Sequence, residues 1–571
     1  MSDQSLKERL RSAALGADRA KLAAIAGVIS SRVLAWSLPP PPADQLLIVP
    51  QDLRTADPSF WREIQHGQFG LAGSLAFLHK RSPFDIEPPT LAWERELHGF
   101  GWLRNLDAVE EESARKAARR LAVMWVGRFG NSAGVATEPA VAARRLISWL
   151  SHASLLLDGA DARTYETVTT SLGRQLAQLS SSWHEALDGY PRLLCLIALT
   201  LADLSIAGRE RHLKEMEATL SAELDRQILP DGGHVSRNPS VLVELMLDLL
   251  PLSQCFVARD RSHPTQLLEA IARIWPMLRF LRLGDGMLAR FNGTSVPFAA
   301  GLGTVFAYDD GWSEAITEAP ASGYVRMEHG VSILIADVAG PPAPALAGEA
   351  QAGCLSFELS TGSQLLLVNG GMPGPAGPDW EPAARATANH NTLCLGEQSS
   401  SRLAAHRRLE AITGSAPIRH PDTVEWTLNE IDEGKLLQAS HDGYHRRFGL
   451  IHTRRLFLSA DGRRLEGSDR LEGLRQVVRL RTDLPFAIHF HLYPDVTCWL
   501  TDEPNTVGIR LADGEFWRFT AEGAAVSIED SAYFANSTGP RRALQIVLRA
   551  ATFGESEVNW VIERAIEEKQ E

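Results

Sequence analysis

The stretch Asp231-Gly232-Gly233-His234-Val235-Ser236-Arg237-Asn238-Pro239 lies between two helical patterns, and the rest of the chain is organised around it. One amphipathic pattern ends at Pro230, and the next begins at Ser236 or Asn238 with Pro239 in its first helical position. The two glycines permit a tight turn. The stretch therefore predicts a short loop that presents His, Ser, Arg and Asn at a helix N-terminus, where free N–H groups favour an anion. A plain turn followed by a helix start would explain the same residues.

Helical periodicity extends along the chain on both sides of this loop. Apolar residues at spacings of three and four predict helices over 92–104, 108–128, 138–157, 162–184, 190–206, 210–228, 238–258 and 264–283. Short connections between long helices favour antiparallel hairpins, stacked as an array or closed into a ring. Residues 5–38 are also expected to be helical and to end at the stiff linker Pro39-Pro40-Pro41-Pro42, and 46–49 is expected to be a short strand.

The pattern changes at about Tyr324, where short β-type runs bounded by turns replace the helical period. These runs predict strands over 331–336, 355–359, 364–368, 392–395, 449–458, 486–492, 514–520 and 543–550. Since no long helical pattern intervenes, the fold class is an α+β multidomain chain whose second part is an antiparallel β-sandwich. The expected units are 1–55 (helical segment and Pro-rich linker), 56–320 (helical domain) and 321–571 (sandwich). A cleft between such domains is a usual place for a ligand.

Composition excludes several classes of protein. The 571 residues carry 57 Lys and Arg against 70 Asp and Glu, a net charge of −13, which disfavours a nucleic-acid-binding protein. The cysteines are odd in number and lack paired spacing, so neither a disulfide framework nor a zinc cluster is expected; they are Cys195, Cys255, Cys354, Cys394 and Cys498.

The N-terminal residues carry charges throughout and show no apolar segment followed by a small-residue cleavage site. We therefore expect a cytoplasmic location, with the periplasm as the alternative. No run of 18 uncharged apolar residues is present, so we expect no membrane insertion.

Several segments together resemble the heparinase II/III-like polysaccharide lyases, whose members join an α/α toroid to an antiparallel β-sandwich. The resemblance runs from about residue 55 to near the C-terminus. Besides the 231–239 loop it rests on Leu97-His98-Gly99-Phe100-Gly101-Trp102-Leu103, Arg144-Arg145-Leu146-Ile147-Ser148-Trp149-Leu150, Gly284-Asp285-Gly286, Phe291-Asn292-Gly293, Arg385-Ala386-Thr387-Ala388-Asn389-His390-Asn391-Thr392, His441-Asp442-Gly443-Tyr444 and Phe448-Gly449-Leu450-Ile451-His452-Thr453-Arg454-Arg455. It implies an incomplete toroid over about 60–315 and a sandwich over about 324–560.

The resemblance also implies β-elimination on a uronic-acid-containing glycan. Such a reaction needs groups that offset the charge of the uronate carboxylate and a Tyr or His that transfers protons. Asn238 and His234 match the toroid segment that neutralises the carboxylate, and His390 matches the histidine that the sandwich contributes; all three are expected to face one cleft. Candidate substrate-binding residues are Arg237, Arg385, Asn292, Trp149 and Tyr324. For these residues the alternative is a structural role: a strand start at His390, a bridge between domains at Arg385, a core position for Trp149.

The family's catalytic tyrosine has no counterpart in the expected region, because Leu281–Thr294 reads LRLGDGMLARFNGT. Tyr308 and Tyr324 are the nearest candidates, and Tyr308 is slightly preferred as the proton donor.

Three functions remain open at this point. The first is a lyase acting on an acidic oligo- or polysaccharide, and the second is a non-catalytic glycan-binding protein on the same scaffold. A glycoside hydrolase is the third, for which Asp231 and Asp285 are the only suggestive carboxylates. We expect no cofactor and no metal, although His489 and His491 share one face of a strand near His441 and His452.

Overall fold

The computed structural model describes residues 42–130, 132–295, 299–311, 313–374, 377–403, 417, 419–473, 483–552 and 555–565. The helix expected over 5–38 lies outside these residues, as does most of the proline linker.

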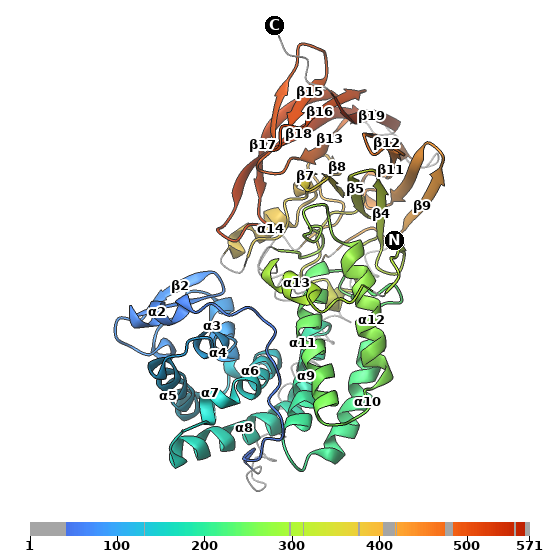
Figure 1. Cartoon of the computed structure of the whole chain (residues 1–571). Coiled ribbons are helices and arrows are strands. Elements are labelled where there is room, and N and C mark those ends of the chain that lie inside the picture. The colour runs from blue at the N-terminus through green and yellow to red at the C-terminus, as the bar shows by residue number, and fades with distance from the viewer. Residues whose placement is uncertain are drawn as a thin grey trace, which may run out of the picture.

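The first part of the chain is helical and forms an incomplete α/α toroid (Figure 1). Thr90 and Asp161 begin two of its helices by accepting hydrogen bonds from Trp93 and Thr164 N–H groups, 3.1 and 2.9 Å away. Two expected helices are each divided into two. The helices are α2 (Ser59–Gln65), α3 (Leu91–Gly99), α4 (Leu103–Asp107), α5 (Glu112–Phe129), α6 (Pro139–Ser151), α7 (Ala153–Leu157), α8 (Ala162–Ser182), α9 (Tyr190–Ser205), α10 (Glu210–Gln227), α11 (Pro239–Ala258), α12 (Thr265–Phe280) and α13 (Ala299–Phe306).

Several elements of the toroid differ from the sequence prediction, and helices α2 and α13 were not expected. A β-hairpin, β1 (Gln68–Leu71) and β2 (Ser74–Phe77), lies between the strand expected over 46–49 and the first helix expected at residue 92. The strand expected over 46–49 is wrong: Leu46 makes only an isolated bridge to Ile206 at the end of α9, because no second strand lies there to extend the pairing.

The second part is built from antiparallel strands, as predicted, and lies above the toroid in Figure 1. One sheet has the order β14-β15-β16-β19-β12-β11-β10-β9, a second β17-β18-β13-β8 and a third β3-β4-β5-β6-β7. The strands are β3 (Glu318–Ala319), β4 (Tyr324–His329), β5 (Ser332–Asp337), β6 (Phe357–Thr361), β7 (Gln364–Leu367), β8 (Leu393–Leu395), β9 (Val424–Ile431), β10 (Gly434–His441), β11 (Leu450–Ser459), β12 (Arg464–Gly473), β13 (Leu484–His491), β14 (Thr497–Leu500), β15 (Thr506–Arg510), β16 (Phe516–Glu522), β17 (Ala525–Tyr533), β18 (Arg541–Thr552) and β19 (Glu555–Arg564). Two four-residue helices, α14 (Glu381–Ala384) and α16 (His445–Phe448), lie in the connections.

Helix α11 follows the 231–239 loop and packs against α9, α12 and α13 in the toroid core. Among the described helices it alone is long and apolar enough to cross a membrane by length and composition, and 61% of its most apolar 18-residue stretch is buried inside the protein. Glu244 and Asp248 lie on this helix, so α11 carries core residues together with two acidic groups, of which Asp248 is buried.

Candidate functional site

The 231–239 loop begins α11 in the way that its sequence predicts. Asn238 is the N-cap, and its Oδ1 accepts a hydrogen bond from Ser240 N–H at 2.9 Å, with Pro239 in the first helical position. The other end of the same amide is also engaged, because Nδ2 donates to Glu349 Oε2 at 2.7 Å. Both ends of the Asn238 side chain are therefore satisfied by the protein itself.

Arg237, expected to bind substrate, is a structural link between the toroid and the sandwich. It has a left-handed backbone (φ 59°) and a buried guanidinium. That group pairs with Asp337 and donates to the carbonyls of Ser322 and Gly323, with further bonds to Ala339 and Gly340. With its donors occupied by these partners, Arg237 has no surface left for a sugar.

His234 is buried and fully hydrogen-bonded. Its Nε2 lies 2.7 Å from Gln227 Oε1, and its Nδ1 accepts from Ser236 N–H at 3.1 Å. Burial lowers the pKa of His234 to about 3, so the ring is neutral at physiological pH. A neutral ring without a free nitrogen supports the architecture of the loop and presents no charge to a carboxylate.

One loop of the sandwich, residues 347–354, lies against most of the predicted residues and defines what we call the junction site: Asn238, His234, Asn292, Tyr324, Arg385 and His390. Glu349 bonds Asn238, and Gln351 N–H donates to Asn292 Oδ1 at 3.4 Å. Arg385 Nε donates to Ala350 O at 2.8 Å and also contacts Ala347 O and Glu381. The structure therefore brings distant segments together, but it places Arg385 against backbone carbonyls instead of a cleft.

His390 is the one junction residue with a ring nitrogen left open. Its Nδ1–H donates to Ala386 O at 2.8 Å, while Nε2 is buried and makes no hydrogen bond with any described residue. Gly353 covers the ring so closely that a Cβ there would lie 2.6 Å from His390 Cδ2. Burial lowers the pKa of His390 to about 4, so Nε2 carries a lone pair at neutral pH.

The two candidate tyrosines differ in exposure, and neither is an obvious proton donor. Tyr324 is 1% exposed; its OH donates to Arg237 O and accepts from Asn292 Nδ2 at 2.9 Å. Burial raises the pKa of Tyr324 above its ordinary value. Tyr308 follows α13, is 39% exposed and makes no side-chain hydrogen bond with a described residue.

Three further predicted residues are structural. Trp149 is 1% exposed and packs edge-on against Phe100 and Trp125. It therefore belongs to the core and presents no face to a sugar. Asp231 bonds Ser322, and Asp285 caps its own turn at Met287 N. Neither aspartate is poised as one of a catalytic pair, which removes the support for a hydrolase at these positions.

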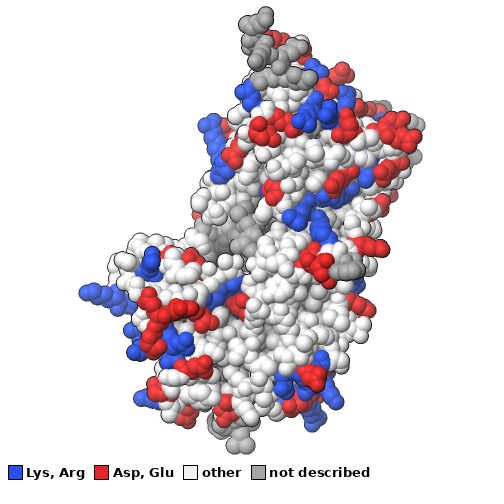
Figure 2. Space-filling model, in the orientation of Figure 1, with Lys and Arg blue, Asp and Glu red and all other residues white. Residues whose placement is uncertain are grey.

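A second site, the toroid cleft, was not anticipated from the sequence. It is a cavity of about 620 Å³ between α3 and α6 on one side and α11 and α13 on the other. Figure 2 shows the surface hollowed between the first toroid helices and the sandwich, with basic and acidic side chains beside the hollow. Small residues line much of it, including Gly99, Gly101 and Gly301, and four arginines reach it: Arg54, Arg95, Arg104 and Arg144.

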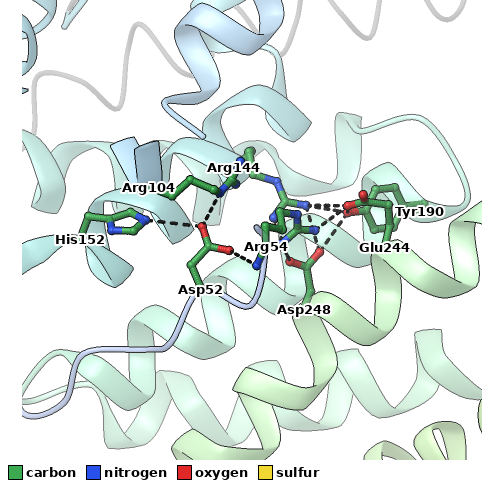
Figure 3. Close-up of polar contacts among 8 residues, drawn as sticks. All are labelled: Asp52, Arg54, Arg104, Arg144, His152, Tyr190, Glu244 and Asp248. Carbon is green, nitrogen blue, oxygen red and sulfur yellow. Dashed lines mark hydrogen bonds and ion pairs between the residues drawn. The ribbon is translucent and has the colours of Figure 1, made fainter. Parts of the chain in front are cut away.

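A network of ion pairs holds the floor of the toroid cleft (Figure 3). Asp248 of α11 is buried and receives Arg54 Nη1 and Arg144 Nη1, both at 2.8 Å. Arg144 Nη2 also donates to Tyr190 OH at 2.6 Å, and Glu244 pairs with Arg54. Burial opposes ionisation of Asp248, yet the two arginines hold its pKa below the ordinary range.

Arg104 of α4 also lines the toroid cleft, and part of its guanidinium group has no partner among the described residues. Its Nε donates to Asp52 Oδ2 at 2.9 Å, and Asp52 lies 3.4 Å from His152 Nε2. Neither Nη group of Arg104 makes a hydrogen bond with a described residue, although the side chain is only 17% exposed. Unused guanidinium donors beside a small-residue surface suit a carboxylate or sulfate group.

Burial raises the pKa of Tyr190 well above its ordinary value, although Arg144 acts against that rise. Tyr190 is thus a neutral phenol that bonds Asp248 Oδ2 at 2.9 Å. Ten residues separate Asp248 from Asn238, which is about 15 Å along a helix. Tyr190 therefore belongs to the cleft floor, while the preceding residue, Gly189, lies against the ring of His234 in the junction site.

Among the arginines of the toroid cleft, only Arg144 lies in a motif that the sequence analysis singled out. Arg144 lies in the quoted Arg144-Arg145 motif, but its neighbour Arg145 points into the core, where it bonds Gln175 and lies 4.1 Å from the Trp125 ring centre. Asp52 and Arg54 lie in a segment without regular periodicity. No local pattern distinguishes these residues.

No group of three or more His, Cys, Asp or Glu residues suited to a metal ion occurs in the part of the chain that the structure describes. The histidines considered for zinc are engaged otherwise. His441 and His452 bond each other, and His452 bonds Asp469, while His489 bonds Gln545 and His491 bonds Ser531.

Both the helical part and the sandwich of this chain are similar to parts of known proteins. Residues 313–561 match the family model described as Heparinase II/III-like, C-terminal. FtsZ-localized protein C of Caulobacter vibrioides is 31% identical over 529 residues, which cover 90% of this chain and 90% of that protein. Among solved structures, a heparinase III superposes with a TM-score of 0.65 at 14% identity over 86% of this chain and 79% of that chain. Heparan sulfate lyase HepC of Pedobacter heparinus gives 0.58 at 15% identity over 98% and 91%; at such identities the likeness shows the fold alone.

Proposed function

The chain belongs to the heparinase II/III-like family, and from this premise we propose that it binds an acidic oligosaccharide in the toroid cleft without cleaving it. The observation that carries the proposal is the Asn238 amide, which bonds Ser240 at one end and the Glu349 carboxyl group at the other. In a uronate lyase this amide would face the substrate carboxylate. Here a carboxyl group of the chain itself occupies that partner position.

The toroid cleft supplies the binding surface in this proposal. Arg104 contributes unused donors, and Arg95, whose side chain is 49% exposed, lies beside it. Two of the carboxylates that compensate the arginines lie beneath the surface, with Asp248 and Asp52 side chains 1% and 9% exposed. Glu96 and Glu244 also line the cleft, so the Nη groups of Arg104 are the donors that an acidic glycan would meet there. The relative from Caulobacter is named for its localisation and not for a reaction, which agrees with a binding role.

The test is a panel of immobilised uronate-containing glycans, with neutral dextran as the control. We expect salt-sensitive binding of at least one acidic glycan, because surface charge contacts weaken as ionic strength rises. Arg104→Lys keeps the charge but removes the guanidinium donors, and should weaken binding about tenfold, the effect of losing about 1.4 kcal/mol. Arg163→Gln, an exposed arginine outside the cleft, is the matched control. Absence of binding to every acidic glycan would refute the proposal.

Cleavage is the second candidate function, and one observation favours it: the unpartnered Nε2 of His390 could accept a proton. Ultraviolet absorbance reports the unsaturated uronate that β-elimination releases. Release that disappears in His390→Gln would establish a lyase and replace the binding-only proposal. We expect no release from the wild-type protein.

A further inference from the structure

A second concave surface lies on the outer side of the toroid, between the β1–β2 hairpin and α5. This basic groove has a volume of about 690 Å³. Its floor is apolar and includes the buried residues Phe69 and Leu121, and its walls carry Phe77 and Met124, which are 56% and 39% exposed. Exposed side chains of this size beside a concave surface are typical of a docking site.

The charged residues that line the groove are all basic. Lys80, Arg81 and Arg120 line the groove together with His66 and His79, and no Asp or Glu is among the lining residues. The whole chain has a net charge of −13, so this local excess runs against the composition. The three cations are exposed and form no ion pair with any residue in the described ranges.

The turn that follows β2 and carries Lys80 and Arg81 has an uncommon backbone. His79 and Lys80 are successive non-glycine residues with left-handed conformations, φ 47° and 64°. Such conformations persist where the surrounding structure holds them, and they are enriched at ligand sites. They present the Lys80 and Arg81 side chains at the rim opposite Arg120 of α5.

We propose that the basic groove binds an acidic peptide segment of a partner protein, with a bulky apolar side chain of that segment against Phe77 and Met124. Charge complementarity selects the acidic residues, because clustered Lys and Arg recognise acidic motifs. The concave apolar floor selects a single inserted side chain, which a flat bilayer surface would not supply. The groove shares no residue with the toroid cleft, so this inference is independent of glycan binding.

Selection from a random 12-residue peptide display library against the purified full-length chain tests the proposal. We expect enriched peptides in which Asp or Glu residues flank Phe, Leu, Ile or Trp. Arg120→Glu combined with Lys80→Glu should weaken a selected peptide at least about tenfold, and Phe77→Ser alone should weaken it too. Arg163→Glu and Arg104→Lys, both outside the groove, should leave peptide binding unchanged. Lys80, Arg120, Phe77 and Arg163 are exposed, so circular dichroism should show that the variants at these positions are folded.

Each other outcome overturns the proposal. Failure to enrich acidic–apolar peptides would do so, as would selected peptides that bind the charge-reversed variant equally well. Flotation with phosphatidylglycerol vesicles that depends on Lys80 and Arg120, without peptide binding, would assign the groove to a membrane surface. A concentration-dependent dimer lost in the same variants would assign it to a second copy of the chain.

Discussion

At the junction site the polar side chains other than His390 bond the protein itself, whereas in the toroid cleft Arg104 keeps two Nη groups without a hydrogen-bond partner among the described residues. Both sites lie along α11, one at its N-terminus and the other about 15 Å further on. The difference teaches that residue types associated with a reaction do not by themselves make a reactive site. What matters is whether their hydrogen-bonding groups remain available once the chain has folded.

The largest expected effect concerns the ion network of the cleft. Asp248→Asn leaves Arg54 and Arg144 without their shared buried counter-ion and should lower the free energy of unfolding by about 3–5 kcal/mol. Urea denaturation measures the change. The exposed pair Arg95–Glu138 provides the control, because Glu138→Gln should change stability by less than about 1 kcal/mol. Equal effects of the two substitutions would show that the cleft network is not held by Asp248.

The next effect tests the buried ring of His390. Its pKa is about 4 in the folded chain against 6.5 ordinarily, so between these pH values the unfolded state binds a proton that the folded state does not. Stability should therefore fall as pH falls from 6.5 to 4, by up to about 3 kcal/mol from this residue. His390→Gln should remove that part of the pH dependence in urea denaturation at several pH values. The other buried histidines are present in both proteins and cancel in the difference, except for His491, whose pKa is lowered in part by His390. Identical pH profiles of the two proteins would show that the ring of His390 is in contact with solvent.

The tyrosines distinguish a structural from a catalytic junction. Tyr324→Phe removes the hydrogen bonds to Arg237 O and Asn292 and should cost about 1–2 kcal/mol in thermal or urea unfolding. Tyr308→Phe should change stability by less than about 0.5 kcal/mol, because that hydroxyl makes no hydrogen bond within the described ranges. If the protein releases unsaturated uronate and either substitution abolishes the release, that tyrosine is the proton donor and the junction site is reactive after all.

The smallest effect concerns Glu349. Glu349→Ala removes the carboxyl group from Asn238 Nδ2 and leaves space for a small anion. Acetate at about ten times its Kd should then stabilise the variant by about 1.4 kcal/mol, measured as a rise in Tm, and should leave the wild type unchanged. Glu349→Gln keeps a hydrogen-bond acceptor at this position and is the matched control. A variant that acetate does not stabilise would show that Glu349 does not occupy an anion position.

Much of the fold could be predicted because its signals are local. The start of α11 at Asn238 and Pro239, and the change from helix to strand before Tyr324, agree with the structure. The period of the apolar residues depends only on neighbours in sequence. The β1–β2 hairpin and α13 escaped prediction because each is short and offers too few residues to establish a period.

The candidate site could be predicted only as a set of segments. The sequence predicts that the 231–239 loop and the segment around His390 belong to one site, and each of them contacts the 347–354 loop, at Glu349 and at Gly353. It could not indicate that Glu349 would bond Asn238, since 111 residues separate the two. Exposure and hydrogen-bond partners arise from contacts between distant segments, which carry no local pattern.

Arg144 and Arg145 show which properties of a residue the sequence predicts and which depend on the tertiary structure. The sequence by itself placed both on one amphipathic helix of a heparinase-like toroid and followed it with a sandwich of antiparallel strands. Successive residues point about 100° apart around a helix, so one arginine can face a cleft while the next is buried. Only the tertiary structure decided that Arg144 bonds Asp248 and Tyr190, while Arg145 lies over Trp125 without a carboxylate partner among the described residues, its pKa lowered by burial to about 9. The physical reason is that burial and pairing depend on which helices pack against α6, and that arrangement is set by the whole toroid.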